Sequence, residues 1–235
     1  MKSMKKIALL LVFCLCLNTI IPTKAYAQTM TSNLSNDLSE ISDDTIIAYI
    51  DGVPITKNDV DKNGRILLDT SSVEKNTVSI KDVVDTSKNP NENNTIQPYL
   101  IPSGTTWYQE ATVKKILSVQ GFSQETYDMY LTVGTARDMA RRFDVSSIES
   151  IGTYLLGFMP GAQAPAVVLL VSQLQRSQVA SDIRKYTDNG NQVRFRLIDS
   201  RYGTLYRVDY WDGSTLDYTL SANERVAYTS LRMPI

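Results

Sequence analysis

The residues between Glu149 and Arg176 carry no charge, and this restricts the fold more than any other feature of the chain. Three large apolar residues in a row, at 169–171, would cover most of the circumference of a helix, so the stretch belongs in a protein core or in lipid. Pro160 and Pro165 divide it into two arms. An arm of about 12 residues reaches only about 18 Å, well short of the hydrocarbon layer of a bilayer. The pattern therefore predicts a helical hairpin that does not permanently span a membrane.

Two roles fit such a hairpin, which we place at residues 147–187. It can insert into a membrane or engage a partner after a conformational change, because its glycines allow helices to approach closely. Alternatively, it forms the core of a domain that has no disulfide bonds. Interior glycines favour the first role slightly, since each costs a water-soluble helix about 1 kcal/mol. The residues expected to engage a membrane or partner are Ile151, Tyr154, Leu155, Phe158, Val167, Leu170 and Val171.

The first 27 residues have the order of an export signal. Three lysines precede an apolar run over residues 7–21, and Ala25 and Ala27 supply the small side chains that a signal peptidase requires. The run of about 15 residues is shorter than the roughly 20 needed for a membrane anchor. We therefore expect a secreted protein that is cleaved after Ala27.

Removal of this signal changes the composition of the remaining chain. Both cysteines and four lysines leave with it, so that 20 basic residues face 25 acidic ones and the net charge is −5. An exported chain without cysteine suits a Gram-positive bacterium, and its acidic balance argues against binding to nucleic acid. The chain also has no histidine, which excludes histidine triads and histidine metal ligands. Whether it is an enzyme stays open, although we expect that it is not.

Composition divides the exported part into four regions. Residues 28–44 are polar and predicted to be disordered. Residues 45–85 contain short strand patterns and turns, typical of a small acidic β-rich module or a propeptide. Residues 86–98 are rich in Asn and read as a linker, so residues 99–235 would form a separate domain.

The predicted C-terminal domain changes its hydrophobic period along the chain. Helical spacing begins near Ser123 and continues through the hairpin, whose first arm follows a capping box at 146–149. A period of two follows over residues 191–220, where large apolar residues alternate with Arg194 and Arg196. We therefore expect an α+β fold: a short acidic β-rich module, a helical region with the apolar hairpin, and then a three-stranded antiparallel β-meander.

A second candidate site lies in the N-terminal module. Asp59, Asp61 and Asn63 provide oxygen atoms at alternate positions, and Gly64 follows where a sharp turn is needed. This segment resembles the calcium loops of the EF-hand kind, including the dockerin-type loops of secreted bacterial proteins. The resemblance implies a Ca²⁺ ion bound by these three side chains. Position 12 departs from the pattern because Thr70 stands where the family has a bidentate glutamate. The alternative is a simple hairpin turn with no cofactor.

Taken together, these patterns favour a secreted, non-enzymatic bacterial protein. Its apolar hairpin would engage a lipid membrane or a cell-envelope component, as in a bacteriocin-like or toxin-like antimicrobial factor. An extracellular binding module for the envelope or matrix, with a structural calcium loop, is the first alternative. A secreted hydrolase that uses carboxylates is the second.

Overall fold

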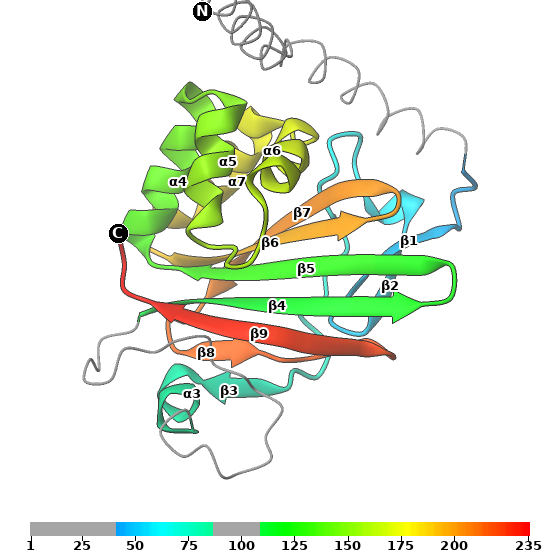
Figure 1. Cartoon of the computed structure of the whole chain (residues 1–235), viewed down its shortest axis with the longest axis horizontal. Coiled ribbons are helices and arrows are strands. Elements are labelled where there is room, and N and C mark those ends of the chain that lie inside the picture. Colours follow the sequence, from blue (N-terminus) through cyan, green and yellow to red (C-terminus); the bar gives the residue numbers. More distant parts are fainter. Residues whose placement is uncertain (1–40, 87–108) are drawn as a thin grey trace, which may run out of the picture.

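The computed structural model describes residues 41–86 and 109–235. These residues form a mixed α+β fold around a five-stranded antiparallel sheet, with two smaller two-stranded sheets beside it (Figure 1). The predicted signal peptide, most of the predicted disordered segment and nearly all of the predicted linker lie outside the described residues. The described part contains no helix long and apolar enough to cross a membrane.

Along the chain, strands come before, between and after the helices. The strands are β1 (Ile46–Ile50), β2 (Val53–Thr56), β3 (Thr77–Ser79), β4 (Glu110–Val119), β5 (Phe122–Leu131), β6 (Gln192–Ser200), β7 (Gly203–Trp211), β8 (Thr215–Asp217) and β9 (Glu224–Arg232). The helices are α3 (Ile80–Thr86), α4 (Val133–Val145), α5 (Ile148–Leu156), α6 (Ala164–Ser172) and α7 (Arg176–Thr187), with a 3₁₀ turn η1 at Lys57–Asp59.

The large sheet has the order β7-β6-β5-β4-β9, and each strand is antiparallel to its neighbours. Helices α4 to α7 cover one face of it (Figure 1). Successive side chains of a strand point to opposite faces, so alternate residues of the central strands meet the helices. The strand residues that pack in this helix-covered core are Tyr127, Met129, Leu131, Val193, Phe195, Leu197 and Tyr206.

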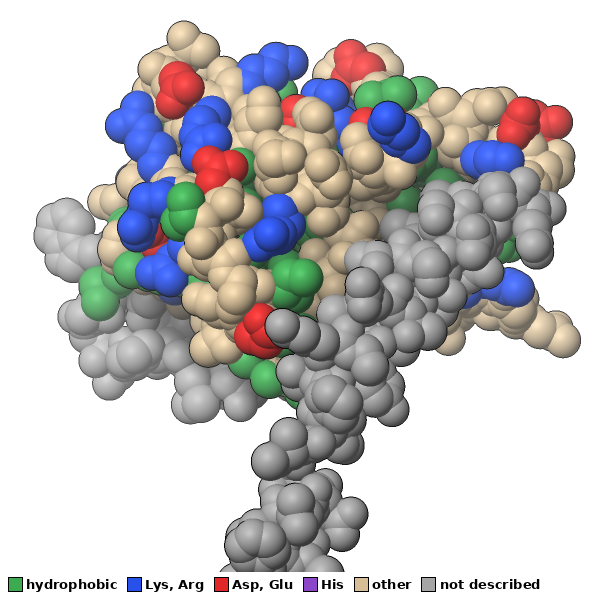
Figure 2. All heavy atoms as spheres, turned by 90° about the horizontal axis from the view of Figure 1, so that it is seen from above, with side chains coloured by type: hydrophobic (Ala, Val, Ile, Leu, Met, Phe, Trp, Pro, Cys, Tyr) green, Lys and Arg blue, Asp and Glu red, His purple; other side chains and the backbone are tan. Residues whose placement is uncertain are grey.

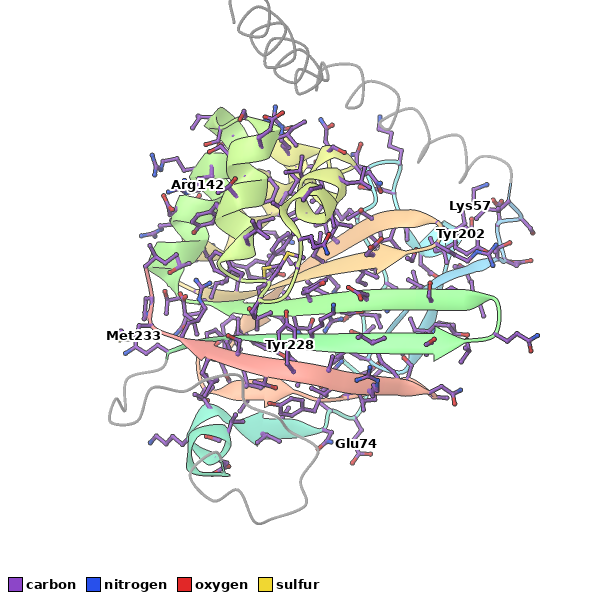
Figure 3. All side chains as sticks on the ribbon, in the orientation of Figure 1. Lys57, Glu74, Arg142, Tyr202, Tyr228 and Met233 are labelled. Atoms are coloured by element: carbon purple, nitrogen blue, oxygen red, sulfur yellow. The ribbon has the colours of Figure 1, made fainter. Side chains whose placement is uncertain are left out.

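The opposite face of the sheet is covered by the N-terminal segment and by β8. One apolar cluster there joins Ile80 and Leu216 to Tyr130 and Trp211 of the sheet. A second cluster joins β1 and β2 to Ile198 of β6. Between the two clusters, the sheet presents charged side chains, which form the floor of the site described below. In Figure 3, Lys57 and Tyr202 mark one end of the sheet and Met233 marks the other.

The predicted order of a helical region followed by a three-stranded meander was wrong at its beginning. Residues 110–131 form the hairpin of β4 and β5 rather than the start of a helix near Ser123. The cause is that β5 is the middle strand of the sheet and both of its faces are buried. Its second face carries polar residues, with Asp128 wholly buried among other charges, and this weakens the period-two signal. The helix begins only at Val133, after Thr132.

The predicted meander over 191–220 was also wrong. β6 and β7 do pair, but β8 pairs with β3, about 140 residues earlier in the chain. The fifth strand of the large sheet is β9, which adds to β4 at the far edge. The second arm of the predicted hairpin is not one helix but two, α6 and α7, separated at Gln173–Gln175. Pairing between strands that are distant in sequence determines this part of the fold, and the local periodicity of hydrophobic residues does not.

Candidate ligand pocket at the sheet edge

A buried cluster of charged side chains lies on the sheet face away from the helices. At its centre, Asp128 accepts hydrogen bonds from Arg196 Nε at 2.6 Å and from Arg194 Nη2 at 2.7 Å. Lys115 Nζ lies 3.2 Å from the same carboxylate. Arg196 is only 1% exposed and Asp128 is fully buried. Because Arg194, Arg196 and Asp128 belong to neighbouring central strands, the sheet itself brings the charges together.

Asp51, in the turn between β1 and β2, completes the cluster from the N-terminal segment. Its carboxylate accepts from Arg196 Nη2 at 3.0 Å, from Thr70 Oγ1 at 3.1 Å and from Lys75 Nζ. Burial alone would raise the pKa of Asp51, but the guanidinium groups of Arg196 and Arg194 hold it well below its usual range. The carboxylate therefore stays ionised and links the N-terminal segment to the centre of the sheet.

Asp128 follows the same balance of effects. Burial acts to raise its pKa, while the charges of Arg194 and Arg196, and then of Lys115, hold the pKa below its usual range. On the other side of Arg194, Nη1 donates to Asp217 Oδ2 at 2.9 Å. A buried group of this kind adds little net stability, but removal of one member leaves charges without partners. The cluster is thus a buried, fully hydrogen-bonded polar floor in which each member compensates another.

A pocket of about 620 Å³ opens beside this floor, at the β7 edge of the sheet. Its walls come from the loop before β3, from β7 and its turn into β8, and from the end of α7. Glu74, marked in Figure 3, belongs to the loop that forms the first wall. The charged and aromatic residues that line the pocket are Asp51, Asp69, Lys75, Tyr130, Tyr186, Arg194, Arg207, Asp209, Tyr210, Trp211, Asp212 and Asp217.

Carboxylates outnumber cations around this pocket, five to three. Asp51 and Asp217 are compensated in the floor, so the excess lies at the rim, where Asp69, Asp209 and Asp212 face one guanidinium. That guanidinium, of Arg207, donates to Asp209 Oδ1 at 2.7 Å and lies 3.7 Å from Asp69. The rim is therefore negatively charged.

Two of the rim carboxylates are held by their own turns. Asp69 accepts from the backbone N–H and the hydroxyl of Ser71, each at 2.9 Å, and these bonds lower its pKa. Asp212 is partly desolvated, which raises its pKa, but the backbone N–H groups of Ser214 and Thr215 outweigh this and the pKa is lowered. Both groups therefore present full negative charge to the pocket at neutral pH.

Aromatic rings complete the pocket wall. Trp211 is fixed because its Nε1 donates to Thr215 O at 2.7 Å and its ring packs edge-on against Tyr130 at 5.5 Å. Tyr210 is 59% exposed, although it is a large aromatic side chain. Tyr186 is half-buried, and burial followed by the nearby charge of Asp209 raises its pKa. Such rings bind hydroxylated, planar or cationic groups.

The residues predicted to engage a membrane lie elsewhere, in the helix-covered core. Six of the seven are buried, and Tyr154 is half-buried with Arg142 over its ring at 4.3 Å. Arg232 of β9 covers the Phe158 ring at 3.3 Å and holds Glu110 at 2.9 Å. Figure 2 shows the helical side from above, where charged side chains of both signs are spread out and apolar ones are scattered. In this structure the hairpin therefore forms part of the helix-covered core.

The predicted calcium ligands lie in two adjacent turns: Asp59 ends η1, and Asp61 and Asn63 belong to the turn that follows it. Both carboxylates have local partners. Asp59 Oδ2 accepts from the backbone and hydroxyl of Thr56 at 2.8 and 2.7 Å. Asp61 Oδ1 accepts from the backbone N–H groups of Asn63 and Arg65. Within residues 41–86 and 109–235, no three acidic, histidine or cysteine side chains are placed to hold a metal ion. Calcium binding here stays a prediction.

Sequence reasoning missed the pocket because its residues come from six separate segments between positions 51 and 217. The one local signal is the run from Arg207 to Asp212, in which every residue except Val208 is charged or aromatic. No family model, curated protein or solved structure matches this chain. The geometry of the pocket is therefore the basis for the proposed function.

Proposed function

We propose that this chain is an exported, non-enzymatic binding protein that holds a positively charged ligand in the pocket beside β7. The observation that carries the proposal is the negative rim, with Asp69, Asp209 and Asp212, set next to the exposed Tyr210 ring and the half-buried Tyr186 ring. A cation gains from the carboxylates and from the negative faces of the rings together. The proposal that the chain is exported rests on the predicted signal peptide.

Binding is better supported than acid catalysis at this site. A glycosidase or similar hydrolase needs one carboxylic acid whose pKa is raised, so that it is protonated when it acts. Here the pKa values of Asp51, Asp69 and Asp212 are all lowered, which keeps these groups ionised. Ionised carboxylates suit the recognition of a cation.

The membrane-engaging hairpin is less well supported than the pocket. Insertion would take six buried apolar side chains out of the core: Ile151, Leu155, Phe158, Val167, Leu170 and Val171. Lipid would keep these six side chains out of water, so the cost of insertion falls on the sheet residues that they leave exposed. At about 1.5–3 kcal/mol each, exposure of Met129, Leu131, Phe195 and Leu197 costs roughly 6–12 kcal/mol, which is comparable to the whole stability of a typical domain. The bacteriocin-like or toxin-like role therefore stays a prediction with its own test.

Calorimetric titration tests the pocket. The full sequence is expressed in a bacterium, and the exported chain is purified from the medium and titrated with spermidine and with arginine amide. Each exposed rim charge contributes about 1 kcal/mol or less, so Asp69→Asn with Asp212→Asn should weaken binding roughly 5- to 30-fold. Asparagine can keep both turns, because its amide oxygen accepts the same backbone bonds.

A matched control removes two charges away from the pocket, by Asp44→Asn with Asp188→Asn. Both residues are exposed, and neither lines the pocket. This control should bind within about twofold of the parent chain, and higher salt should weaken binding in both. Equal loss in the two double variants, or no binding of either cation, would reject the proposal. Amino-terminal sequencing of the same material tests cleavage after Ala27.

Release of dye from anionic liposomes separates this proposal from the hairpin hypothesis. The exported chain is added to vesicles of phosphatidylglycerol and phosphatidylethanolamine at pH 7. A folded core that holds the hairpin predicts no release above buffer alone. Release at micromolar protein would instead support the membrane-active alternative.

A further inference from the structure

The outer edge of β7 is only partly paired. β7 is the first strand of the large sheet, so one of its edges meets β6 and the other faces outward. On that outer edge, Tyr206 N donates to Gly64 O and Tyr206 O accepts from Ile66 N, each at 2.9 Å. Residues 64–66 thus lie along β7 as a very short parallel strand.

The next outward positions on this edge are Val208 and Tyr210. In an antiparallel strand, the N–H and C=O of one residue point to the same side, and successive residues alternate. The register of β7 with β6 runs without a bulge, so Val208 and Tyr210 point outward as Tyr206 does. Within residues 41–86 and 109–235, these outward backbone groups have no hydrogen-bond partner.

The covering segment leaves the edge where the pocket begins. Leu68 O still accepts from the Arg207 guanidinium, but from Asp69 onward the chain forms the opposite wall of the pocket. At Tyr210 the unpaired edge of β7 borders open space of about 620 Å³, and Val208 lies just before it, half-buried. An unpaired strand edge is a template for another strand, and an extended peptide can use it.

We propose that the ligand is a basic peptide that binds in an extended conformation and adds as a strand to β7 at Val208 and Tyr210. This deepens the proposed function and depends on it. The backbone of about three peptide residues pairs with the outward groups, because bonding positions recur every second residue. A lysine or arginine side chain of the peptide lies against the Asp209 and Asp212 carboxylates, and the Tyr210 ring flanks the peptide from the other face of β7. The negative rim selects a basic peptide over a neutral one.

A pair of N-methylated peptides tests the strand pairing. The parent probe is acetyl-Thr-Val-Lys-Val-Thr-amide, and the exported chain is titrated with it by calorimetry. One analogue is N-methylated at the odd positions and the other at the even positions. Only one of these sets faces β7, so one analogue should lose at least tenfold in affinity while the other stays within threefold. Equal behaviour of the two analogues would overturn the peptide proposal.

A single-residue cation separates this inference from the proposed function. N-acetyl-lysine methylamide carries the charge without a strand and should bind at least tenfold more weakly than the pentapeptide. If it binds as tightly, the cation pocket stands and the strand does not. If neither compound binds, the proposed function fails as well. A dimer that forms without peptide and is closed through β7 would show that the edge serves a second copy of the chain.

Val208→Pro tests the same bond from the protein side. Proline removes one outward N–H, which proteins tolerate on an edge strand because that group does not bond within the sheet. The variant should lose at least tenfold in affinity for the pentapeptide and bind N-acetyl-lysine methylamide as the parent does. Val208→Thr keeps the N–H and should bind the pentapeptide as the parent does. Unchanged peptide binding by a folded Val208→Pro variant would contradict the proposal.

Discussion

The two faces of the large sheet are built on opposite principles. The face under α4 to α7 is apolar, and strand residues such as Met129 and Phe195 pack there against helices. The other face carries Arg194, which is 8% exposed, and Asp128 and Arg196, which are buried as completely as the apolar residues behind them. Adjacent residues of β5 and β6 thus belong to two different kinds of interior.

The two faces contribute different things: the apolar face stabilises the fold, and the charged face fixes the position of the N-terminal segment. Apolar burial on the helix face supplies the larger part of the folding free energy, because each large side chain contributes about 1.5–3 kcal/mol. The charged face returns little net energy, since desolvation offsets the ion pairs. What it does provide is one fixed arrangement of the N-terminal segment, through Asp51, and hence the wall of the pocket.

Isosteric substitutions on the two faces should have very different costs. Asp128→Asn removes the charge that compensates Arg194, Arg196 and Lys115, and should lower the free energy of unfolding by about 3–5 kcal/mol. Leu197→Met on the helix face keeps the volume and should cost less than about 1.5 kcal/mol. Urea denaturation followed by circular dichroism measures both. Similar costs would contradict the division between the faces.

Acid should destabilise the charged face selectively. The pKa values of Asp51 and Asp128 lie below their usual range in the folded state, so each stabilises the fold above the ordinary aspartate pKa of about 3.9. As pH falls below that value, the unfolded chain binds protons that the folded chain does not, and stability drops by up to about 2.7 kcal/mol per pH unit. Melting temperatures between pH 7 and pH 2 should show this. In Asp128→Asn, the decline should be shallower, and an identical slope would argue against the assignment.

Gly64 tests the contact between the covering segment and β7. It has a φ of +77°, and a Cβ added there would lie 2.7 Å from Thr204 O. Gly121 has a nearly equal φ of +78° but nothing within 4 Å. Gly64→Ala should therefore cost about 1–3 kcal/mol more than Gly121→Ala, because both pay the backbone strain and only one pays the clash. Thermal melts of the two variants give the difference, and equal shifts would remove the contact from the account.

Local patterns predicted parts of this fold well. The alternation at 193–197 predicted a strand that became β6, and the capping box placed the start of α5 within one residue of Ser147, its actual N-cap. The apolar hairpin was predicted as either membrane-engaging or core, and the structure shows it packed as core. These features depend on neighbours in sequence, which is why a sequence pattern can reveal them.

The parts that were missed depend on distant partners. β5 carries Asp128 toward a buried face because Arg194 and Arg196 arrive there some 66 residues later. The pairing of β8 with β3, and of β9 with β4, leaves no local signal in the chain. The pocket needs all of these pairings before its residues meet. Spacing alone therefore could not predict the site.

An NMR titration tests the binding of a cation beside β7 most directly. The Trp211 indole N–H is a separate reporter inside the pocket, because it donates to Thr215 O and its ring is 4% exposed. On addition of the basic pentapeptide to the ¹⁵N-labelled exported chain, this signal and the amides of Val208, Tyr210 and Asp212 should shift together and saturate. Saturable shifts that map instead to α5 and α6, or no shift at all, would contradict the account.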